Sequence, residues 1–188
     1  MSVLDDLKMI HQRDAQDALG IAQKQHSQLL HHFGADLASL NVPEIQNIIV
    51  GGMGGSALAA LVSMSWPKWN LPFEIVKQYE LPSYAGANTL FIASSYSGNT
   101  EETLSAISRA ADTGCQMAVI ASGGKLAEIA SEHDYPLFQL PTGYQPRMAV
   151  FYNFAALVDI YEKITGSALS DELADTAKWL SEQNQQLL

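Results

Sequence analysis

Hydroxyl side chains gather in one short stretch of this sequence, where they could bind a phosphate group. The stretch is 94–103, SSYSGNTEET, and it places Ser95, Ser97 and Thr100 within six residues. Hydroxyls donate hydrogen bonds without adding net charge. One hydroxyl would be enough to cap a following helix, so three of them favour a phosphate site over a simple cap.

A second stretch, GGMGGS at 51–56, has the same character. Its glycines let the backbone approach a ligand closely, and Ser56 adds a hydroxyl where a helix should begin. We therefore expect Gly54, Gly55 and Ser56 to join the three hydroxyls in binding a phosphorylated ligand. Neither stretch contains Lys or Arg, so amide groups and hydroxyls would have to hold the anion.

The glycine stretch also allows a different hypothesis, a dinucleotide site. Gly52, Gly54 and Ala57 satisfy G-x-G-x-x-A, and Glu80 is expected to end the next strand, where an acidic residue could bind a ribose. So short a pattern is weak on its own. The P-loop pattern G-x-x-x-x-G-K-[ST] is absent.

Ordinary helix capping is the competing interpretation of the hydroxyl stretch. Asn99 or Thr100 could cap the following helix, and Glu102 stands where a capping box places its glutamate. The negative charges of Glu101 and Glu102 would then interact favourably with the positive end of the helix dipole. We expect them to act as caps and not as catalytic bases.

The elements that must position these residues follow from the hydrophobic pattern. Apolar runs predict strands over 45–51, 73–80, 89–94, 115–121 and 135–141. Helical patterns follow each strand, and they include a long apolar helix over 146–164 with a stop at Thr165-Gly166. Helices are also predicted over 3–33, where Gly34 would end the helix, and over 170–186.

Apolar strands separated by helices predict an α/β fold. We expect a doubly wound, parallel sheet of about five strands between layers of helices, similar to flavodoxin. In such sheets, ligands bind at the carboxyl ends of the strands, which is where both candidate turns lie.

Composition excludes some partners. The formal net charge is −10, which does not suit nucleic acid or an anionic membrane surface. Cys115 is the sole cysteine, so no disulfide can form within the chain. No signal peptide is evident, and no apolar stretch is long enough to span a bilayer. We therefore expect a cytoplasmic protein. The adjacent His31 and His32 do not make a metal site, and His133 reads as a surface residue, so neither metal nor cofactor is expected.

Three motifs together resemble the sugar isomerase (SIS) domain, and most of all the N-terminal half of the bifunctional phosphoglucose/phosphomannose isomerases. They are GGMGGS at 51–56, SYSGNTEET at 95–103 and YQPR at 144–147. Their order and spacing are similar to those of the family. The chain departs from the family pattern after Ser56, where ALAALV replaces glycines and an aspartate.

The resemblance implies roles for individual residues. Phosphate of a hexose 6-phosphate would be bound by Ser56, Ser95, Ser97 and Thr100, while Gly55 would contact the sugar through its backbone. Arg147 would stabilise the negative charge of an enediolate, a role that suits a permanently charged guanidinium. A cation at a helix start opposes the helix dipole, which argues against Arg147 as a simple cap.

The resemblance also implies an organisation. Residues 1–40 form a helical segment that packs on the domain, 41–166 form the SIS domain, and 167–188 form a helix that would lead to a second SIS domain. That second domain would supply a glutamate base and a ring-opening histidine. We expect interconversion of glucose 6-phosphate or mannose 6-phosphate with fructose 6-phosphate, and association as a homodimer or with the second domain. A non-catalytic, regulatory phosphosugar-binding module is the alternative.

Overall fold

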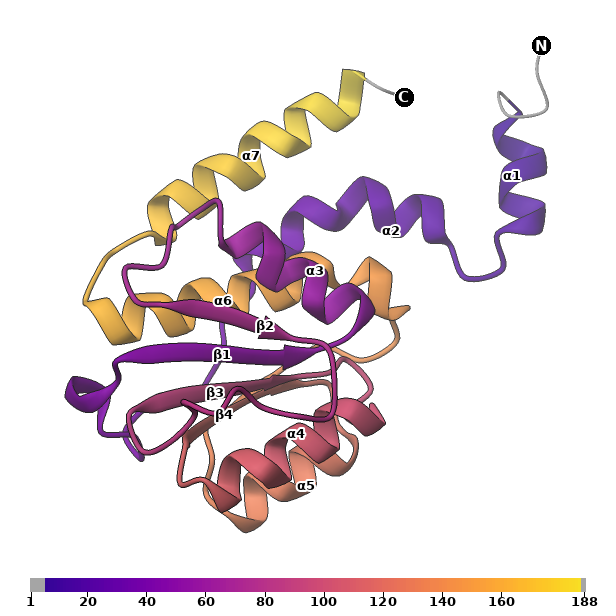
Figure 1. Cartoon of the computed structure of the whole chain (residues 1–188). Helices are drawn as coiled ribbons and strands as arrows, with labels where there is room; N and C mark the ends of the chain where they lie inside the picture. The colour runs from indigo at the N-terminus through magenta and orange to yellow at the C-terminus, as the bar shows by residue number, and fades with distance from the viewer. Residues whose placement is uncertain (1–5, 187–188) are drawn as a thin grey trace.

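The fold is a five-stranded parallel sheet in a computed structural model that describes residues 6–186 (Figure 1). The strands lie in the order β2-β1-β3-β4-β5. They are β1 (Asn47–Gly52), β2 (Phe73–Val76), β3 (Thr89–Ser94), β4 (Gln116–Ala121) and β5 (Leu137–Gln139). Every residue of β3 is buried, as expected for a strand covered on both faces. The predicted α/β class and parallel sheet are confirmed.

Helices cover both faces of the sheet and create two hydrophobic cores. On one face, α3 (Gly54–Ser63) and α6 (Val150–Thr165) pack over the strands. On the other face lie α4 (Glu101–Asp112) and α5 (Gly124–Glu132). This is the three-layer arrangement that the alternation of strands and helices predicts.

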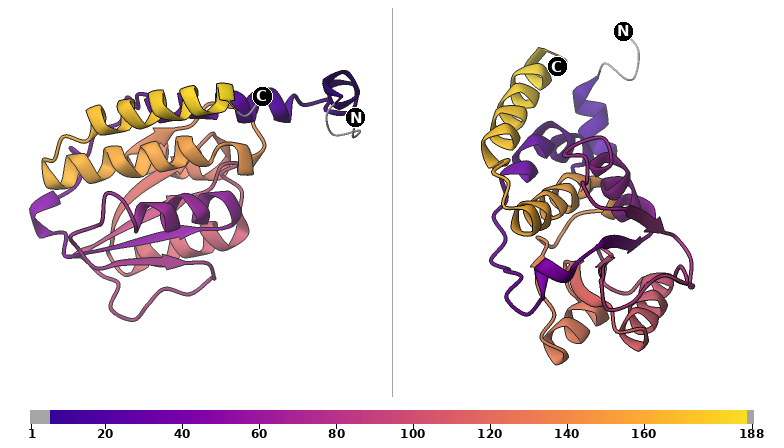
Figure 2. Two further views of the ribbon diagram at one scale, coloured as in Figure 1. Left: turned by 90° about the horizontal axis from the view of Figure 1, so that it is seen from above. Right: turned by 60° about the vertical axis from the view of Figure 1, so that its left-hand side comes forward.

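A further layer lies outside α6. It consists of α7 (Ser170–Gln186), α2 (Ala18–Lys24) and the 3₁₀ helix η2 (Gln25–Leu30), which pack on one another (Figure 2). The remaining elements are short: α1 (Leu7–Arg13), η3 (Val42–Glu44) and η4 (Pro146–Met148).

The order in which successive strands are added to the sheet reverses after β2. From β1 the chain passes outward to β2, and it then returns to the other side of β1 to form β3. Gly51 pairs with Ala93 and Gly52 with Ser94, so the two strands end side by side. The connections that leave them lead to α3 on one face and α4 on the other, and a crevice at such a switch point is the usual ligand site of this fold.

Some predicted boundaries are wrong. The helix expected over 3–33 is divided into α1, α2 and η2, and it ends at Leu30 before Gly34. The break falls at Asp14–Asp17, where the Asp14 carboxylate accepts a hydrogen bond from the Leu19 amide at 2.8 Å and Asp17 has a left-handed backbone. Residues 3–5 of that prediction lie outside the described residues.

Two strands are shorter than predicted. β2 stops at Val76 and not at 80, and β5 covers only Leu137–Gln139. The first residues of the long apolar helix form the separate turn η4, and α6 itself starts at Val150. The helix ends at the predicted stop, where Gly166 has a left-handed conformation. No helix within residues 6–186 is both long and apolar enough to cross a membrane.

Candidate phosphate site

The two turns singled out in the sequence lie against each other at the carboxyl edge of the sheet. A Cβ atom on Gly52 would lie 2.9 Å from the Ser94 carbonyl oxygen and 3.4 Å from the Ser56 Cβ. Gly52 therefore lets the exit of β3 and the first turn of α3 come together. The structure brings Ser56 to the strand that leads directly into the hydroxyl loop, 95–100.

Within that loop, two of the predicted hydroxyls form a pair. Ser95 Oγ and Thr100 Oγ1 lie 2.7 Å apart and share a hydrogen bond. Ser95 and Ser56 are buried, Thr100 is half-buried and Ser97 is exposed. Ser97 Oγ accepts a hydrogen bond from the Asn99 amide at 3.3 Å. The loop thus places hydroxyls both at the protein interior and at the solvent boundary.

Neither helix that starts at this edge is capped by a side chain. Thr100 is the N-cap of α4 and Met53 is the N-cap of α3, and neither side chain accepts a hydrogen bond from its helix. The competing interpretation, a helix cap or capping box at Asn99 and Thr100, is therefore wrong, because Thr100 bonds to Ser95 and Asn99 Oδ1 accepts from the Lys125 amide in α5. Unpartnered amides at two helix starts, each with a partial positive charge, suit an anion.

A third turn supports the loop from behind, and sequence reasoning did not identify it. The Leu126 amide donates to the Gly98 carbonyl oxygen at 3.0 Å, and the Lys125 amide donates to Asn99 Oδ1 at 3.1 Å. Ser122 Oγ also donates to the Tyr96 carbonyl oxygen at 2.6 Å. The first turn of α5 is thus used to hold the loop. The only local signal was Ser122-Gly123-Gly124, another hydroxyl and glycine turn after a strand.

Tyr96 connects the loop to the segment that carries Arg147. Its hydroxyl donates to the Pro141 carbonyl oxygen and accepts from the Tyr144 amide, both at 2.9 Å. Burial raises the pKa of Tyr96 above its usual value. Tyr96 therefore remains a neutral hydrogen-bonding group that fixes the start of the 144–148 segment.

Gly55 explains how Arg147 reaches the edge. A Cβ atom on Gly55 would lie 2.7 Å from the Pro146 carbonyl oxygen and 3.3 Å from the Arg147 Cα. Only a glycine lets η4 approach α3 this closely. Gly54, by contrast, has a left-handed φ of 51° with open space where a Cβ would be. The Gly55 backbone thus lies against the backbone of Pro146 and Arg147, and its contact with a sugar stays a prediction.

The Arg147 side chain is exposed and has no acidic partner among residues 6–186. Its Nε and Nη2 atoms donate to Gln145 Oε1 at 3.1 and 2.7 Å. Gln145 Nε2 in turn donates to Gln16 Oε1, which lies between α1 and α2. Gln145 belongs to the YQPR motif, but its contacts with Arg147 and Gln16 were not predicted, and Gln16 was not identified, because nothing local indicates a contact over such a separation.

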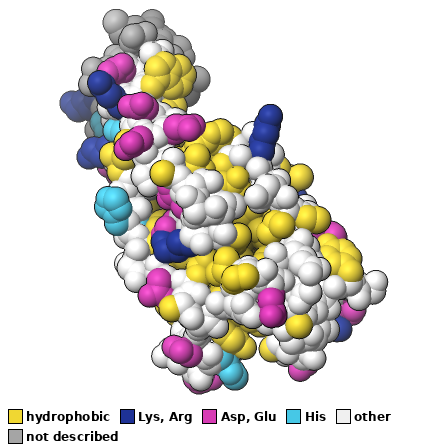
Figure 3. All heavy atoms as spheres, turned by 90° about the vertical axis from the view of Figure 1, so that its left-hand side faces the viewer, with side chains coloured by type: hydrophobic (Ala, Val, Ile, Leu, Met, Phe, Trp, Pro, Cys, Tyr) yellow, Lys and Arg dark blue, Asp and Glu magenta, His cyan; other side chains and the backbone are white. Residues whose placement is uncertain are grey.

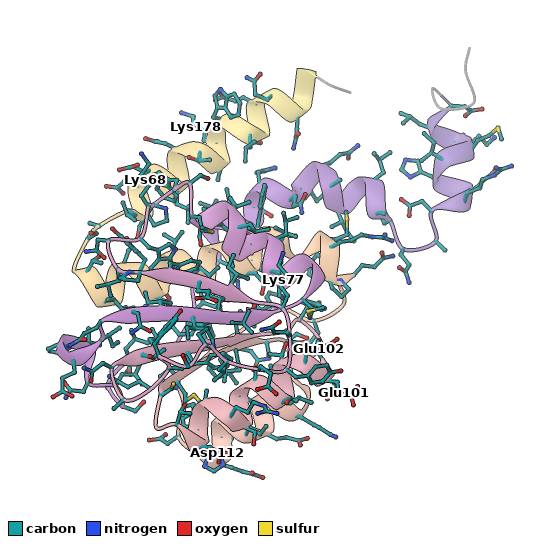
Figure 4. The ribbon with its side chains drawn as sticks, in the orientation of Figure 1. Lys68, Lys77, Glu101, Glu102, Asp112 and Lys178 are labelled. Carbon is teal, nitrogen blue, oxygen red and sulfur yellow. The ribbon has the colours of Figure 1, made fainter. Side chains whose placement is uncertain are left out.

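The charged residues around the edge are of both signs. Figure 4 shows Lys77, Glu101 and Glu102 at this side of the sheet, with Lys77 following β2 and the glutamates opening α4. Neither glutamate forms a hydrogen bond or ion pair with the described residues. The negative charge of Glu101, and to a smaller extent that of Glu102, raises the pKa of Tyr79. Glu101 and Glu102 contribute to the helix dipole interaction without capping the backbone.

The dinucleotide hypothesis loses its acidic residue. Glu80 does not end a strand, since β2 stops at Val76, and its carboxylate forms an ion pair with Arg109 at 3.1 Å.

Across residues 6–186, no three His, Cys, Asp or Glu side chains gather as they would around a metal ion. His31 packs edge-on against Phe33 and Tyr152. On the face drawn in Figure 3, Lys and Arg side chains are few and scattered.

Comparison with known proteins gives relatives whose names specify phosphorylated hexoses. The bifunctional phosphoglucose/phosphomannose isomerase of Caldicellulosiruptor bescii is 38% identical over 149 residues, which is 77% of this chain and 44% of that protein. The D-glucosamine-6-phosphate 4-epimerase of Sulfolobus acidocaldarius is 37% identical over 169 residues, or 80% of this chain and 51% of that protein. The chain thus spans about half the length of these relatives. No family model matches it.

Solved structures show the same fold at lower sequence identity. Tagatose-6-phosphate ketose/aldose isomerase from Escherichia coli superposes with a TM-score of 0.52 and 19% identity, over 78% of this chain and 46% of that chain. At this identity the likeness concerns the fold alone.

Proposed function

The chain belongs to the sugar isomerase (SIS) domain family, and from this premise we propose that the crevice between β1 and β3 binds the phosphate group of a hexose 6-phosphate. The observation that carries the proposal is the meeting of two helix starts without side-chain caps at one group of hydroxyls. Ser56, Ser95, Ser97 and Thr100 would donate to the phosphate oxygens, with the amides of Gly54 and Gly55 beside them.

This binding mode needs no cation in direct contact with the phosphate. Amides at a helix start carry a partial positive charge, and hydroxyls rotate to offer a proton. On a chain of net charge −10, such a site attracts the anion only at short range. The two relatives are named for different reactions, yet both names specify a phosphorylated hexose, which supports the phosphate group as the shared feature.

We further propose that the reaction is aldose–ketose isomerisation through an enediol, with fructose 6-phosphate as the ketose. Arg147 would stabilise the negative charge that develops at C1 and C2 of the open chain, since its guanidinium is charged, exposed and free of any described carboxylate. We assign no described residue of this chain as the base that would remove the proton at C2. Glu101 and Glu102 lie in the first turn of α4, where the helix dipole accounts for them.

Thermal unfolding with and without ligands tests the binding proposal. Fructose 6-phosphate and glucose 6-phosphate should raise the Tm, because a ligand at about 100 times its Kd stabilises by about 2.7 kcal/mol. Fructose and NAD should not. Ser97→Ala should weaken binding about 10- to 100-fold through loss of a hydrogen bond to a charged group.

Ser131→Ala serves as the matched control, because Ser131 is also an exposed serine but lies at the far end of α5. Equal protection by fructose and its phosphate, or unchanged affinity in Ser97→Ala, would contradict the phosphate assignment. Protection by NAD alone would favour the dinucleotide hypothesis. An assay for glucose 6-phosphate isomerisation by residues 1–188 then separates an active domain from a binding module.

A further inference from the structure

The short turn η4, which carries Arg147, is held in place by the N-terminal part of the chain. A 3₁₀ turn of three residues has few hydrogen bonds of its own. The Met148 amide donates to the Gln145 carbonyl oxygen at 2.8 Å. The Ala149 amide donates to the Pro146 carbonyl oxygen at 3.3 Å. Contacts from outside the turn must therefore fix its place, and with it the place of the guanidinium.

The first outside contact is made by Gln28, which lies in η2. Gln28 Nε2 donates to the Met148 carbonyl oxygen at 2.7 Å, although the two residues are 120 positions apart in the sequence. Gln25 Nε2 lies 3.4 Å from the same oxygen. Met148 is the last residue of η4, just before α6 starts at Val150. Two side-chain amides of the N-terminal segment thus converge on the end of the turn.

Packing alone does not account for a glutamine at position 28. The residue is 2% exposed, and its Oε1 atom has no hydrogen-bond partner within residues 6–186. A buried amide oxygen without a partner costs free energy, and an apolar side chain of the same length would occupy this place without that cost. The hydrogen bond that Gln28 donates to η4 is the feature that an apolar residue could not reproduce.

The second outside contact comes from the break between α1 and α2. There, Gln16 Oε1 accepts a hydrogen bond from Gln145 Nε2. The Oε1 atom of the same Gln145 side chain accepts from the Arg147 guanidinium. The break itself is fixed, because the Asp14 carboxylate accepts from the Leu19 amide at 2.8 Å. Gln16 is therefore presented to Gln145 by a defined turn of the chain.

The contacts have a chemical character in common. Each of these hydrogen bonds is made by the neutral amide of a glutamine, which donates and accepts without carrying charge. The N-terminal segment can therefore hold η4 while leaving the charge of Arg147 uncompensated. On the other side of the turn, Gly55 lets α3 pack closely against Pro146 and Arg147. The turn is thus supported from two sides.

We propose that Gln28 and Gln16 are positioning residues for Arg147. Gln28 fixes the backbone of η4 through the Met148 carbonyl group, and Gln16 fixes the Gln145 amide that orients the guanidinium. The segment 16–28 then belongs to the candidate site, although none of the three motifs lies in it. This inference rests on the proposed function for the use that is made of Arg147, but the attachment can be measured without a ligand.

Amide hydrogen exchange of the full chain tests the attachment of the turn. Gln28→Met keeps the length of the side chain and removes its donor. The amides of Met148 and Ala149 should then exchange about 3- to 10-fold faster, as expected for the loss of one hydrogen bond. The amides of β3, whose residues are all buried, should exchange no faster than in the wild type. Unchanged exchange at Met148 would overturn the role of Gln28, and equal acceleration in β3 would show that Gln28 supports the whole fold and not the turn.

Gln16→Ala is an independent variant, because Gln16 is exposed and its side chain is not needed for the core. The readout is the motion of the Arg147 Nε–H group on the ps–ns timescale, measured by the ¹H–¹⁵N NOE. The signal is assigned by its loss in Arg147→Lys. Gln16→Ala and Gln28→Met should both lower the NOE. An unchanged NOE in either variant would remove that residue from the proposal.

Calorimetry connects the attachment to the proposed function. The test ligand is a phosphorylated aldonic acid, whose carboxylate mimics the charge of an enediolate. Its preference over fructose 6-phosphate should fall about 3- to 10-fold in Gln28→Met, and no further when this substitution is added to Arg147→Ala. A fall of equal size in the Arg147→Ala background would show that Gln28 acts independently of Arg147, which rejects the proposal. A wild type without any preference would contradict the proposed function of Arg147, and the exchange and NOE results would still decide its positioning.

Gln23→Met is the matched control on the same segment. Gln23 contacts His26 and Asn184 through its backbone carbonyl oxygen and not through its side chain. The variant should keep the wild-type exchange at Met148, the wild-type NOE of Arg147 and the wild-type ligand preference. If Gln23→Met changes these values as Gln28→Met does, any disturbance of α2 loosens η4, and the specific role of Gln28 is rejected.

Discussion

The guanidinium of Arg147 is held by a single atom, Oε1 of Gln145, which accepts hydrogen bonds from Nε at 3.1 Å and from Nη2 at 2.7 Å. An arginine has five N–H donors, so most of this guanidinium remains available to a ligand. Its partner is a neutral amide and not a carboxylate, so the positive charge is not compensated there. Gln145 thus orients Arg147 while leaving it able to attract an anion.

Arg147→Ala should abolish selectivity for a ligand with negative charge at C1. In the wild type, a phosphorylated aldonic acid, whose carboxylate mimics the charge of an enediolate, should bind more tightly than fructose 6-phosphate. The variant should lose this preference, by about 10- to 100-fold, because a hydrogen bond to a charged group is lost. Affinity for fructose 6-phosphate itself should change little. Isothermal titration calorimetry measures both ligands.

Arg147→Lys controls for charge, and Gln145→Ala controls for orientation. Lysine keeps the charge but lacks the fork of donors, so it should retain part of the preference. Gln145→Ala should reduce the preference by less than Arg147→Ala does. Equal losses for both ligands in Arg147→Ala would make Arg147 a simple binding residue.

The hydroxyl pair of Ser95 and Thr100 should bind phosphate as a unit. Their 2.7 Å hydrogen bond means that removing one hydroxyl also frees the other. Ser95→Ala and Thr100→Val should each weaken fructose 6-phosphate binding about tenfold, and the double variant should lose less than the sum of the two free energies. Binding measured by calorimetry on all four proteins gives the coupling.

Thr113→Val is the matched control at the other end of α4. Its hydroxyl donates to the carbonyl oxygens of Arg109 and Ala110 at 3.1 Å, so the substitution affects stability without touching the ligand. Additive losses at Ser95 and Thr100 would show that the two hydroxyls act on separate ligand atoms. Unchanged affinity in both single variants would remove the pair from the site.

The strands, and the meeting of the two candidate turns at one edge of the sheet, could be predicted because buried strands are apolar runs in the sequence. β3 is buried at every residue, and the apolar run 89–94 has the same limits as the strand. Carboxyl ends of parallel strands meet at one edge, so two turns far apart in sequence could be placed together. The last helix, 170–186, was also predicted with its bounds.

The contacts inside the candidate site could not be predicted, because a polar group has several possible partners and the tertiary structure selects one of them. Thr100 could bond to its own helix or to Ser95, and local spacing favours the cap, yet the folded loop selects Ser95. Two other contacts join segments far apart in the sequence: the first turn of α5 supports Gly98, and Gln16 bonds to Gln145, the partner of Arg147. By contrast, the break at Asp14–Asp17 had a local signal, two aspartates that compete with the helix, which was outweighed by the apolar spacing.

Cys115 should react slowly with a thiol reagent in the folded chain. It is 8% exposed, and burial raises the pKa of its thiol, so the reactive thiolate is scarce near neutral pH. The rate with an aromatic disulfide should be lower than in the urea-unfolded chain by more than about tenfold. Ser131→Cys adds an exposed thiol to the same protein as a control. A native Cys115 that reacts as fast as this added cysteine would contradict the burial.

Gly98 should tolerate no side chain, because its backbone and its surroundings both exclude one. Its φ of +67° is left-handed, and a Cβ atom would collide with the Gly123 carbonyl oxygen in the turn that supports the loop. Strain at left-handed φ costs roughly 1–2 kcal/mol, and forcing the two turns apart adds about 1–3 kcal/mol. Gly98→Ala should therefore lower the free energy of unfolding by roughly 2–5 kcal/mol, as measured by urea denaturation.

Gly114→Ala separates the two causes. Gly114 has a similar φ of +76°, but nothing lies within 4 Å of its Cβ position, so only the backbone strain of roughly 1–2 kcal/mol should appear. If the two substitutions cost the same, the contact between Gly98 and Gly123 contributes nothing, and the loop does not depend on the turn before α5. A larger loss at Gly98, accompanied by weaker fructose 6-phosphate binding in the molecules that remain folded, shows that this turn holds the hydroxyls in position for phosphate.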